Sequence, residues 1–255
     1  MAESRHYCLV IPAYNESSTI RAVVEGALRY LPRVIVVDDG SQDGTAQQLT
    51  GLPVTVLHHA RNLGKAASLW DGMEAALAAG ATDVVTMDGD GQHDPNELPK
   101  LLRAAEAHPG QLVIGSRLWN PAAIPKARYR ANRFANFWIA WASGQGVEDS
   151  QSGFRVYPAA LLRHCQLRRG PERSFVLESE IIIEAAWRGF PCVFTPVHTA
   201  YPTHARPSHF RPVTDIARIT RMVAWRLLCR GLYPEGLWRS LTRPPRRAES
   251  PAAAM

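Results

Sequence analysis

Two carboxylates, an amide and an imidazole lie within a six-residue stretch, Asp88–Gly–Asp90–Gly–Gln92–His93. Carboxylates two residues apart on a loop can share a hard divalent cation, and such a cation commonly binds a diphosphate. The simpler interpretation is a polar turn whose side chains cap the next helix. The elements on either side of the loop therefore matter, because they decide what it can reach.

An apolar and β-branched run, Val84–Met87, precedes this stretch and predicts a short buried strand. A helix is predicted soon after, because Asp94 suits the N-cap, Pro95 suits the first helical position and Glu97 completes a capping box. In an open α/β sheet, ligands bind at the carboxyl ends of the strands. We therefore expect the loop Asp88–His93 at the ligand-binding edge of a sheet.

Three further polar loops follow predicted strands in the same way. The strands are Tyr7–Ile11, Val34–Val37 and Val54–Leu57, and the loops after them are Pro12–Glu16, Asp38–Ser41 and Arg61–Lys65. Another strand is predicted over Leu112–Ser116, and helical patterns separate these strands. This alternation predicts an α/β fold with a doubly wound, mostly parallel central sheet and flanking helices, in a single domain.

Several classes of protein are disfavoured. No G-x-G-x-x-G follows the first strand and no G-x-x-x-x-G-K-[ST] is present, which argues against dinucleotide-binding and P-loop folds. The cysteines have no metal-ligand spacing and are typical of buried thiols in a reducing cytoplasm. No signal peptide is evident, and the longest uncharged run, Phe134–Val147, is shorter than the roughly 20 residues of a spanning helix. We expect a cytoplasmic protein that does not cross a membrane.

The net charge of +6 is concentrated near the C-terminus. Residues 206–247 contain ten arginines against Asp215 and Glu235, a charge of +8, so the rest of the chain carries −2. This segment indicates an anionic membrane surface or a phosphate group as partner. Nucleic acid is disfavoured, because the segment has few aromatics for stacking and no recognised binding module.

The periodicity of Val213–Arg230 predicts an amphipathic helix with apolar residues on one side and arginines on the other. The apolar positions are Ile216, Ile219, Val223 and Leu227, and the arginines are Arg218, Arg221 and Arg226. Such a helix either packs on the domain through its apolar side or lies on a membrane surface. The residues after Pro234 are expected to form a flexible tail.

Six short stretches together resemble the family 2 glycosyltransferases of the GT-A fold. In chain order they are I-P-A-Y-N-E, V-V-D-D-G-S-Q-D-G-T, N-L-G-K-A, D-G-D-G-Q-H, G-S-R and Q-S-G-F-R. The resemblance covers about Tyr7 to Tyr157, and within the family the chain looks most like the polyprenyl- or dolichyl-phosphate sugar transferases. It implies a metal-dependent, inverting transfer of a hexose from a nucleotide-diphospho-sugar of the GDP-mannose or UDP-glucose type to a lipid-linked acceptor.

The resemblance also implies roles on the donor side. Pro12, Tyr14 and Glu16 would line the nucleoside pocket, with Asp39 or Asp38 bonding the base or ribose. Lys65 would face the donor phosphates. The metal ligands would be Asp88, Asp90 and Gln92, which would hold Mg²⁺ or Mn²⁺ against the diphosphate.

On the acceptor side the resemblance implies roles for Arg117, Arg133 and Arg155. A hydroxyl acceptor would need a general base, for which Glu180, Glu178 and Asp149 are the choices, whereas a lipid phosphate is already ionised and needs none. The expected catalytic residues are Asp90, Arg117, Glu180 and Asp149. The family's R-x-x-G-x-S-K is represented only by Arg206–Arg211, which keeps Ser208 but lacks the lysine, so phosphate and hydroxyl acceptors both stay open.

The expected organisation is a transferase domain over residues 1–212, with a nucleotide-sugar half at 1–117 and an acceptor half at 118–212. The basic helix would span 213–233 and the tail 234–255. Two other functions are weighed: a nucleotidyltransferase, which would need a Gly-rich basic loop after the first strand, and a non-catalytic nucleotide-binding protein of the membrane surface. We expect the chain at the inner face of the cytoplasmic membrane, as a peripheral protein.

Overall fold

The computed structural model describes residues 5–121, 124, 126–165, 176–198 and 212–248 of the chain. The chain forms two compact units that interleave in sequence. Unit 1 comprises Met1–Pro99, Phe154–Ser174 and His198–His209, and unit 2 comprises Lys100–Gly153, Phe175–Val197 and Phe210–Met255. This division differs from the expected halves at 1–117 and 118–212, because the chain leaves unit 1 at Pro99 and returns to it at Phe154.

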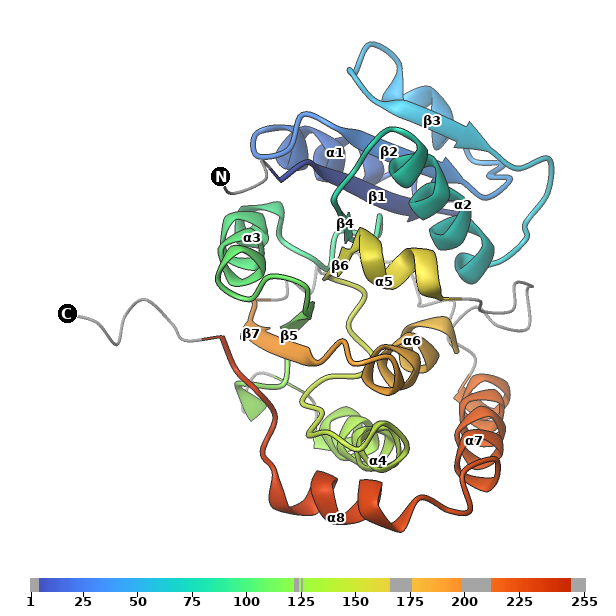
Figure 1. Ribbon diagram of the computed structural model, residues 1–255. Coiled ribbons are helices and arrows are strands. Elements are labelled where there is room, and N and C mark those ends of the chain that lie inside the picture. Colours follow the sequence, from blue (N-terminus) through green and yellow to red (C-terminus); the bar gives the residue numbers. More distant parts are fainter. Residues whose placement is uncertain (1–4, 122–123, 125, 166–175, 199–211, 249–255) are drawn as a thin grey trace. The chain divides into compact units, whose positions relative to one another are not determined.

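Unit 1 contains a sheet with strand order β3-β2-β1-β4-β6 (Figure 1). Its strands are β1 (Tyr7–Ala13), β2 (Val34–Asp38), β3 (Thr55–His58), β4 (Asp83–Thr86) and β6 (Arg155–Pro158). The pairs β1–β2, β1–β4 and β2–β3 are parallel, and β4–β6 is antiparallel. Strands were predicted at the first four places, and the mostly parallel arrangement agrees with the prediction.

The helical elements of unit 1 follow its strands. They are α1 (Ile20–Leu28), the short helix η1 (Ala46–Leu49), α2 (Lys65–Ala78), the short helix η2 (Pro95–Glu97) and α5 (Ala159–His164). Helix α2 packs on β1 and β2. The approach is close at Gly72, where a Cβ would lie 2.4 Å from Cγ1 of Val10. Helix α3 (Leu98–Ala107) begins in unit 1 and continues in unit 2.

The predicted N-cap at Asp94 is present. Its carboxylate accepts a hydrogen bond from the Asn96 backbone N–H at 2.9 Å, and Pro95 opens the first turn. Glu97 was expected to complete a capping box, and its Oε1 lies 2.7 Å from Nδ1 of His198. The strand β4, its polar loop and the helix after it therefore follow the predicted order.

Unit 2 contains the parallel strand pair β5 (Leu112–Ser116) and β7 (Cys192–Pro196). Its long helices are α4 (Lys126–Ser143), α6 (Leu177–Trp187) and α7 (Pro212–Leu228). Helix α6 is buried along most of its length, and its buried residues include Glu178, Glu180 and Glu184 as well as the apolar run Ile181–Ile183. Helix α4 packs against α6 and α7. No helix in the described ranges is long and apolar enough to span a membrane.

The end of the chain differs from the expected tail. Residues Pro234–Thr242 form helix α8, which packs on α4. Beyond it the backbone runs beside β7, where the Phe194 N–H donates to the carbonyl of Arg246 at 2.9 Å and the Ala248 N–H donates to the carbonyl of Phe194 at 2.9 Å. The expectation of a flexible tail from 234 is therefore wrong as far as Ala248. Only residues 249–255 lie outside the described ranges at this end.

Candidate active site

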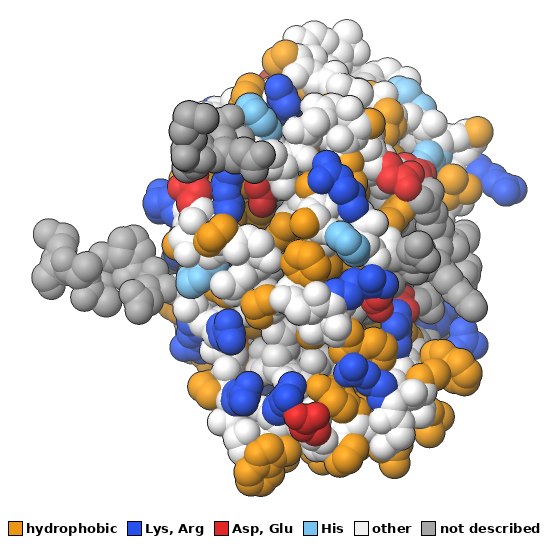
Figure 2. Space-filling view, in the orientation of Figure 1, with side chains coloured by type: hydrophobic (Ala, Val, Ile, Leu, Met, Phe, Trp, Pro, Cys, Tyr) orange, Lys and Arg blue, Asp and Glu red, His pale blue; other side chains and the backbone are white. Residues whose placement is uncertain are grey.

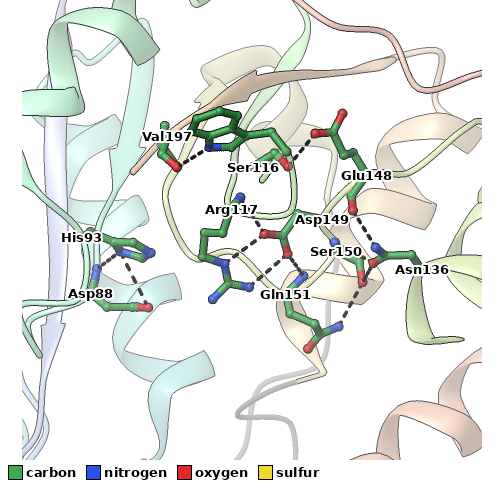
Figure 3. A network of polar contacts seen from close by, with 11 residues as sticks. Asp88, His93, Ser116, Arg117, Asn136, Glu148, Asp149, Ser150, Gln151 and Val197 are labelled. Atoms are coloured by element: carbon green, nitrogen blue, oxygen red, sulfur yellow. Dashed lines mark hydrogen bonds and ion pairs between the residues drawn. The ribbon is translucent and has the colours of Figure 1, made fainter. Parts of the chain in front are cut away.

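One of the predicted metal ligands, Asp88 in the loop after β4, pairs with a lysine. The Nζ atom of Lys65, the first residue of α2, lies 2.6 Å from Oδ1 of Asp88. The backbone N–H of Asp88 donates to Nδ1 of His93 at 3.3 Å (Figure 3). The imidazole is buried and stacks on Phe154 with the ring centroids 5.3 Å apart. His93 is therefore fixed by packing, as a positioning residue would be.

The second carboxylate of the motif shapes its own loop. Oδ1 of Asp90 accepts a hydrogen bond from the backbone N–H of Gln92 at 2.9 Å. Thr19 donates its hydroxyl to the carbonyl of Gly89 at 2.8 Å, which joins this loop to the start of α1. Gly91 has a φ of 75°, a conformation that favours glycine.

The side chains of this loop could supply some of the ligands of a metal ion, with phosphate oxygens and water supplying the others. Among the described residues there is no group of three or more His, Cys, Asp or Glu side chains placed to hold a metal ion. Two carboxylates and an amide from Asp88, Asp90 and Gln92 are oxygen donors, which hard cations prefer. Mg²⁺ is usually held in this way, by one or two carboxylates together with phosphate oxygens and water.

The loop after β1 is joined to the loop after β2 by hydrogen bonds. The Asn15 N–H donates to the Ser41 hydroxyl and the Gln42 N–H donates to the Asn15 side-chain oxygen, both at 2.8 Å. Asn15 has a φ of 54°, which asparagine tolerates better than most residues. The Glu16 N–H donates to the buried Thr45 hydroxyl at 2.8 Å. Sequence reasoning quoted these motifs and missed the roles of Asn15 and Thr45 in holding them together.

Asp43 also joins the loop after β1 to the loop after β2. Its carboxylate accepts hydrogen bonds from the backbone N–H groups of Ser17 and Thr45, each at 3.0 Å. Burial opposes ionisation of this carboxyl, but the hydrogen bonds from Thr45 and Ser17 together outweigh it and lower its pKa to about 2. The residues expected to line the nucleoside pocket lie at the end of β1 and in the loop after it. They are Pro12, Tyr14 and Glu16, and all three are partly exposed.

The aspartates after β2 bind backbone groups. Asp39 accepts hydrogen bonds from the N–H groups of Leu63 and Gly64, each at 2.8 Å, so it shapes the loop that leads to Lys65. Asp38 accepts from the Ser41 N–H at 3.1 Å, which is the turn-capping arrangement. Both carboxyl groups are buried. Their contacts make them positioning residues of the loops and leave the expected contact with base or ribose as a prediction.

A histidine that sequence reasoning missed lies beside Asp39. Nδ1 of His59 is 2.7 Å from Oδ1 of Asp39, and Nε2 of the same ring is 3.1 Å from Oδ2 of Asp71 on α2. The imidazole therefore links the end of β3 to α2 and to the Asp39 carboxylate. The H-H-A-R-N-L-G-K stretch contains this residue, but spacing alone gives no signal that both ring nitrogens meet carboxylates.

In unit 2 Arg117 forms a two-pronged ion pair with Asp149. The guanidinium donates from Nε to Oδ2 at 2.9 Å and from Nη2 to Oδ1 at 3.0 Å, and the Arg117 backbone N–H donates to Oδ2 at 3.0 Å (Figure 3). Burial alone would raise the pKa of Asp149, but the charge and hydrogen bonds of Arg117 and the N–H of Gln151 outweigh it and lower the pKa. Asp149 is therefore held as a carboxylate, with both oxygens bonded.

The residues around this pair form one network. Asn136 donates from its side chain to the Glu148 carbonyl at 2.6 Å, and the Ser150 hydroxyl donates to the Asn136 side-chain oxygen at 2.7 Å. The Ser116 hydroxyl donates to Oε1 of Glu148 at 2.9 Å, and Nε of Arg247 donates to Oε2 at 2.7 Å. The loop that carries Asp149 is thus fixed to β5, to α4 and to the chain after α8.

The second candidate base, Glu180, also meets an arginine. Arg226 of α7 donates from Nη2 to Oε1 of Glu180 and from Nη1 to Oε2 of Glu184, both at 2.9 Å. Glu180 and Glu184 are one turn apart on α6 and both are buried. Arg226 was expected on the polar side of its helix with Arg218 and Arg221, and the structure shows that this side meets two carboxylates of α6 at Arg226. Ile216 was expected on the packed side of the same helix, but its side chain is 50% exposed.

The remaining acceptor-side residues are placed differently from one another. Arg133 is exposed on α4. Arg155 is completely buried in β6, where it pairs with Thr86 of β4. Glu178 is buried on α6. Ser208 lies outside the described residues.

Comparisons with known proteins agree with this arrangement. Residues 8–165 match the model of glycosyl transferase family 2. The polyprenol monophosphomannose synthase of Mycolicibacterium smegmatis is 30% identical over 74% of this chain and 75% of its own. The undecaprenyl-phosphate mannosyltransferase of Micrococcus luteus is 29% identical over 74% of this chain and 81% of its own.

Two further matches are informative. A UDP-N-acetylglucosamine–dolichyl-phosphate N-acetylglucosaminyltransferase of Methanococcus voltae is 31% identical over 64% of this chain and 73% of its own. Glucosyl-3-phosphoglycerate synthase from Mycobacterium tuberculosis, solved with Mn²⁺, UDP and glucosyl-3-phosphoglycerate, superposes with a TM-score of 0.61 at 23% identity, over 89% of this chain and 80% of its own. The chain belongs to glycosyl transferase family 2. It is a glycosyltransferase, and the expected GT-A fold is confirmed.

Proposed function

We propose that the chain transfers a hexose, with inversion, from a nucleotide-diphospho-sugar to a polyprenyl phosphate, with Mg²⁺ or Mn²⁺ as cofactor. The names of three relatives support a polyprenyl or dolichyl phosphate as acceptor. The solved complex of a structural neighbour with Mn²⁺ and UDP-glucose supports the donor class and the metal. A GDP- or UDP-linked donor fits equally well with the residues described.

The donor-side chemistry rests on the loop after β4 and on the start of α2. Asp88, Asp90 and Gln92 would hold the cation, which supplies positive charge against the departing nucleoside diphosphate. Lys65 at the start of α2 would move from Asp88 to a phosphate oxygen when the donor binds. The N-terminus of α2 adds backbone N–H groups that favour an anion. The Asp39 carboxylate positions this lysine by holding the loop before it.

One observation carries the choice of acceptor: two of the three candidate general bases, Asp149 and Glu180, are bound by arginines. Asp149 is paired with Arg117 and has a lowered pKa, and Glu180 is paired with Arg226. A carboxylate of low pKa is a poor base for a hydroxyl group near neutral pH. A phosphate acceptor needs no base, because its oxygen is already ionised. That oxygen would attack the sugar C1 while the bond from C1 to the diphosphate breaks and the nucleoside diphosphate departs.

The acceptor side would then contribute positive charge. Arg117 and Arg133 are the exposed or partly exposed guanidiniums of unit 2 that the resemblance assigns to the acceptor. Arg155, being completely buried in β6, would act by holding its strand in place beside β4. We further propose that the chain works as a peripheral protein at the inner face of the cytoplasmic membrane, where a polyprenyl phosphate is embedded.

Titration calorimetry with UDP, GDP and their hexose derivatives, with and without Mn²⁺, tests the donor side. We expect one nucleotide to bind tightly only with the metal, and Asp90→Ala to weaken it by about a hundredfold or more, as expected for the loss of a charged metal ligand. Glu25→Ala is the matched control. Glu25 is an exposed acid of α1 that pairs with Arg21, one helical turn before it. No binding of any nucleotide would overturn the proposed function.

Transfer of radiolabelled sugar to polyprenyl phosphate and to the corresponding polyprenol tests the acceptor. We expect product from the phosphate alone. Product from the alcohol at a comparable rate would instead favour the hydroxyl acceptor and a base-assisted reaction.

A further inference from the structure

Large apolar side chains are exposed mainly at the end of unit 2. Among the described residues, six of them lie on α7, on α8 and in the turn between these helices; one is Ile216 in the first turns of α7, and the other five lie from Trp225 onward. The five are Trp225 (67% exposed), Leu228 (64%), Leu232 (54%), Trp238 (70%) and Leu241 (66%). We call these five residues the α7–α8 surface. Figure 2 shows orange and blue side chains side by side along the edge that α8 forms in Figure 1.

The helical positions explain why these side chains point outward. In α8 the buried residue is Gly236, and Trp238 and Leu241 follow it by about 200° and about 140° around the helix, on the side away from α4. In α7 the same relation holds between buried Val223 and exposed Trp225. The exposed tryptophans therefore belong to the faces opposite the packed ones.

Helix α8 is firmly fixed in unit 2. A Cβ on Gly236 would lie 2.1 Å from the ring of Tyr233 and 2.8 Å from the carbonyl oxygen of Trp141, so α8 approaches α4 as closely as a glycine allows. Trp141 donates its indole N–H to the carbonyl of Leu232 at 2.9 Å. The side chains of the α7–α8 surface are therefore exposed in the folded state, because no loosening of α8 is needed to present them.

Helix α7 is fixed in the same unit by charge. Arg226 binds both acids of α6, and its guanidinium lies 5.1 Å from the ring centroid of Trp187. Arg230 lies 4.4 Å from the Trp187 ring and 4.6 Å from the Tyr233 ring. These contacts hold Arg226 and Arg230 against unit 2, whereas Arg221 is exposed to solvent.

The surroundings of the α7–α8 surface are strongly basic. Residues 212–248 contain eight arginines and no lysine, against Asp215 and Glu235, a net charge of +6. Arg221 lies four residues before Trp225 and seven before Leu228, so these three share one outward stripe of α7. Arg243 is exposed just after α8.

We propose that the α7–α8 surface lies on an anionic lipid bilayer. Its tryptophans and leucines enter the headgroup region, and Arg221 and Arg243 meet the lipid phosphates. An amphipathic helix with aromatic and leucine residues beside arginines is suited to this plane. Tryptophan also favours the membrane–water interface.

Charge decides between this partner and a second copy of the chain. A two-fold contact through the α7–α8 surface would place one +6 segment against another, which is unfavourable. An anionic bilayer instead attracts every exposed arginine of the segment. The inference deepens the proposed function, on which it rests for the membrane-embedded acceptor.

Flotation of the full chain with vesicles tests the inference. The vesicles are phosphatidylcholine alone or phosphatidylcholine mixed with phosphatidylglycerol, with no nucleotide present. We expect binding to the anionic vesicles only, weakened roughly thirtyfold in Arg221→Gln/Arg243→Gln. Trp238→Ser/Leu241→Ser should weaken it by at least about tenfold. Tyr30→Ser is the matched control, because Tyr30 is an exposed aromatic of unit 1 and its loss should not change binding.

Folding controls distinguish a loss of membrane binding from a loss of structure. Near-ultraviolet circular dichroism and thermal unfolding must show that each variant folds, and if Trp238→Ser/Leu241→Ser unfolds, quenching of wild-type tryptophan fluorescence by brominated lipid takes its place. Unchanged vesicle binding by both double variants, or a concentration-dependent dimer that Trp238→Ser abolishes, would overturn the inference. Metal-dependent nucleotide binding without any vesicle binding would overturn this inference alone and leave the proposed function standing.

Discussion

At the scale of single residues, arginine pairing decides what the acids of unit 2 can do. Asp149 and Glu180 were both expected as general bases, and each meets a guanidinium at 2.9 Å. Their spacing in the chain, 32 residues between Arg117 and Asp149 and 46 between Glu180 and Arg226, is too irregular to predict such pairs from sequence.

Asp149→Asn is expected to destabilise the chain by roughly 3 kcal/mol near neutral pH, because it leaves the partly buried Arg117 charge without its carboxylate. The pKa of Asp149 is lowered in the folded state, so its contribution is fully present above the ordinary value of 3.8 and is lost as the pH falls below it. The difference in the free energy of unfolding between wild type and variant should therefore shrink in acid. Urea unfolding from about pH 7 to about pH 3 measures it.

Asp43→Asn is the comparison for that experiment. The Asp43 carboxyl also has a lowered pKa, about 2, but it is exposed and its partners are neutral. Its loss should change stability less than the loss of Asp149. An equal loss from both variants would show that the Arg117 charge is not what Asp149 stabilises.

At the scale of elements, strands and their polar loops could be predicted, whereas the C-terminal helices could be predicted only in part. Runs such as Val34–Val37 are short and β-branched at every position, which favours a buried strand over a buried helix. The sequence also predicts a helix near Val213–Arg230. Its contacts could not be predicted, because the two acids that bind Arg226 lie on α6, far away in the chain.

Helix α8 was missed for a different reason. Residues 234–248 combine prolines, arginines and few apolar positions, which is typical of a tail. The helix is stabilised by contacts of its backbone and of Gly236 with α4. A glycine at a close contact gives no hydrophobic signal in the sequence, and in a helix it even lowers the expected propensity.

Gly236→Ala is expected to destabilise unit 2 although alanine favours a helix by about 1 kcal/mol over glycine. The new methyl group would meet the Tyr233 ring and the Trp141 carbonyl at distances that require α8 to shift. Overpacking of this kind costs about 1–3 kcal/mol, so the net effect should be a loss of stability. Thermal unfolding measures it, with Ser240→Ala in the same helix as the control. A stabilised Gly236→Ala chain would mean that α8 does not pack closely on α4.

At the scale of the whole molecule, donor chemistry and basic charge belong to different parts of the chain. The expected metal and diphosphate residues, Lys65, Asp88 and Asp90, belong to unit 1, whereas the segment of +6 charge belongs to unit 2. The donor-side motifs could be predicted because short polar stretches carry them. The division into units could not, because it depends on contacts between segments far apart in sequence.

This division predicts that membrane attachment and donor binding can be separated. In Trp238→Ser/Leu241→Ser the affinity for nucleotide with Mn²⁺ should stay within about twofold of wild type, because both substituted residues lie in unit 2 and neither belongs to the donor-side loops. Transfer to a long polyprenyl phosphate in anionic vesicles should fall by at least about tenfold relative to transfer to a short, water-soluble prenyl phosphate, since only the former requires the bilayer. The ratio of the two rates is the readout, because a general loss of activity cancels in it. An unchanged ratio would mean that the acceptor reaches the enzyme without the α7–α8 surface.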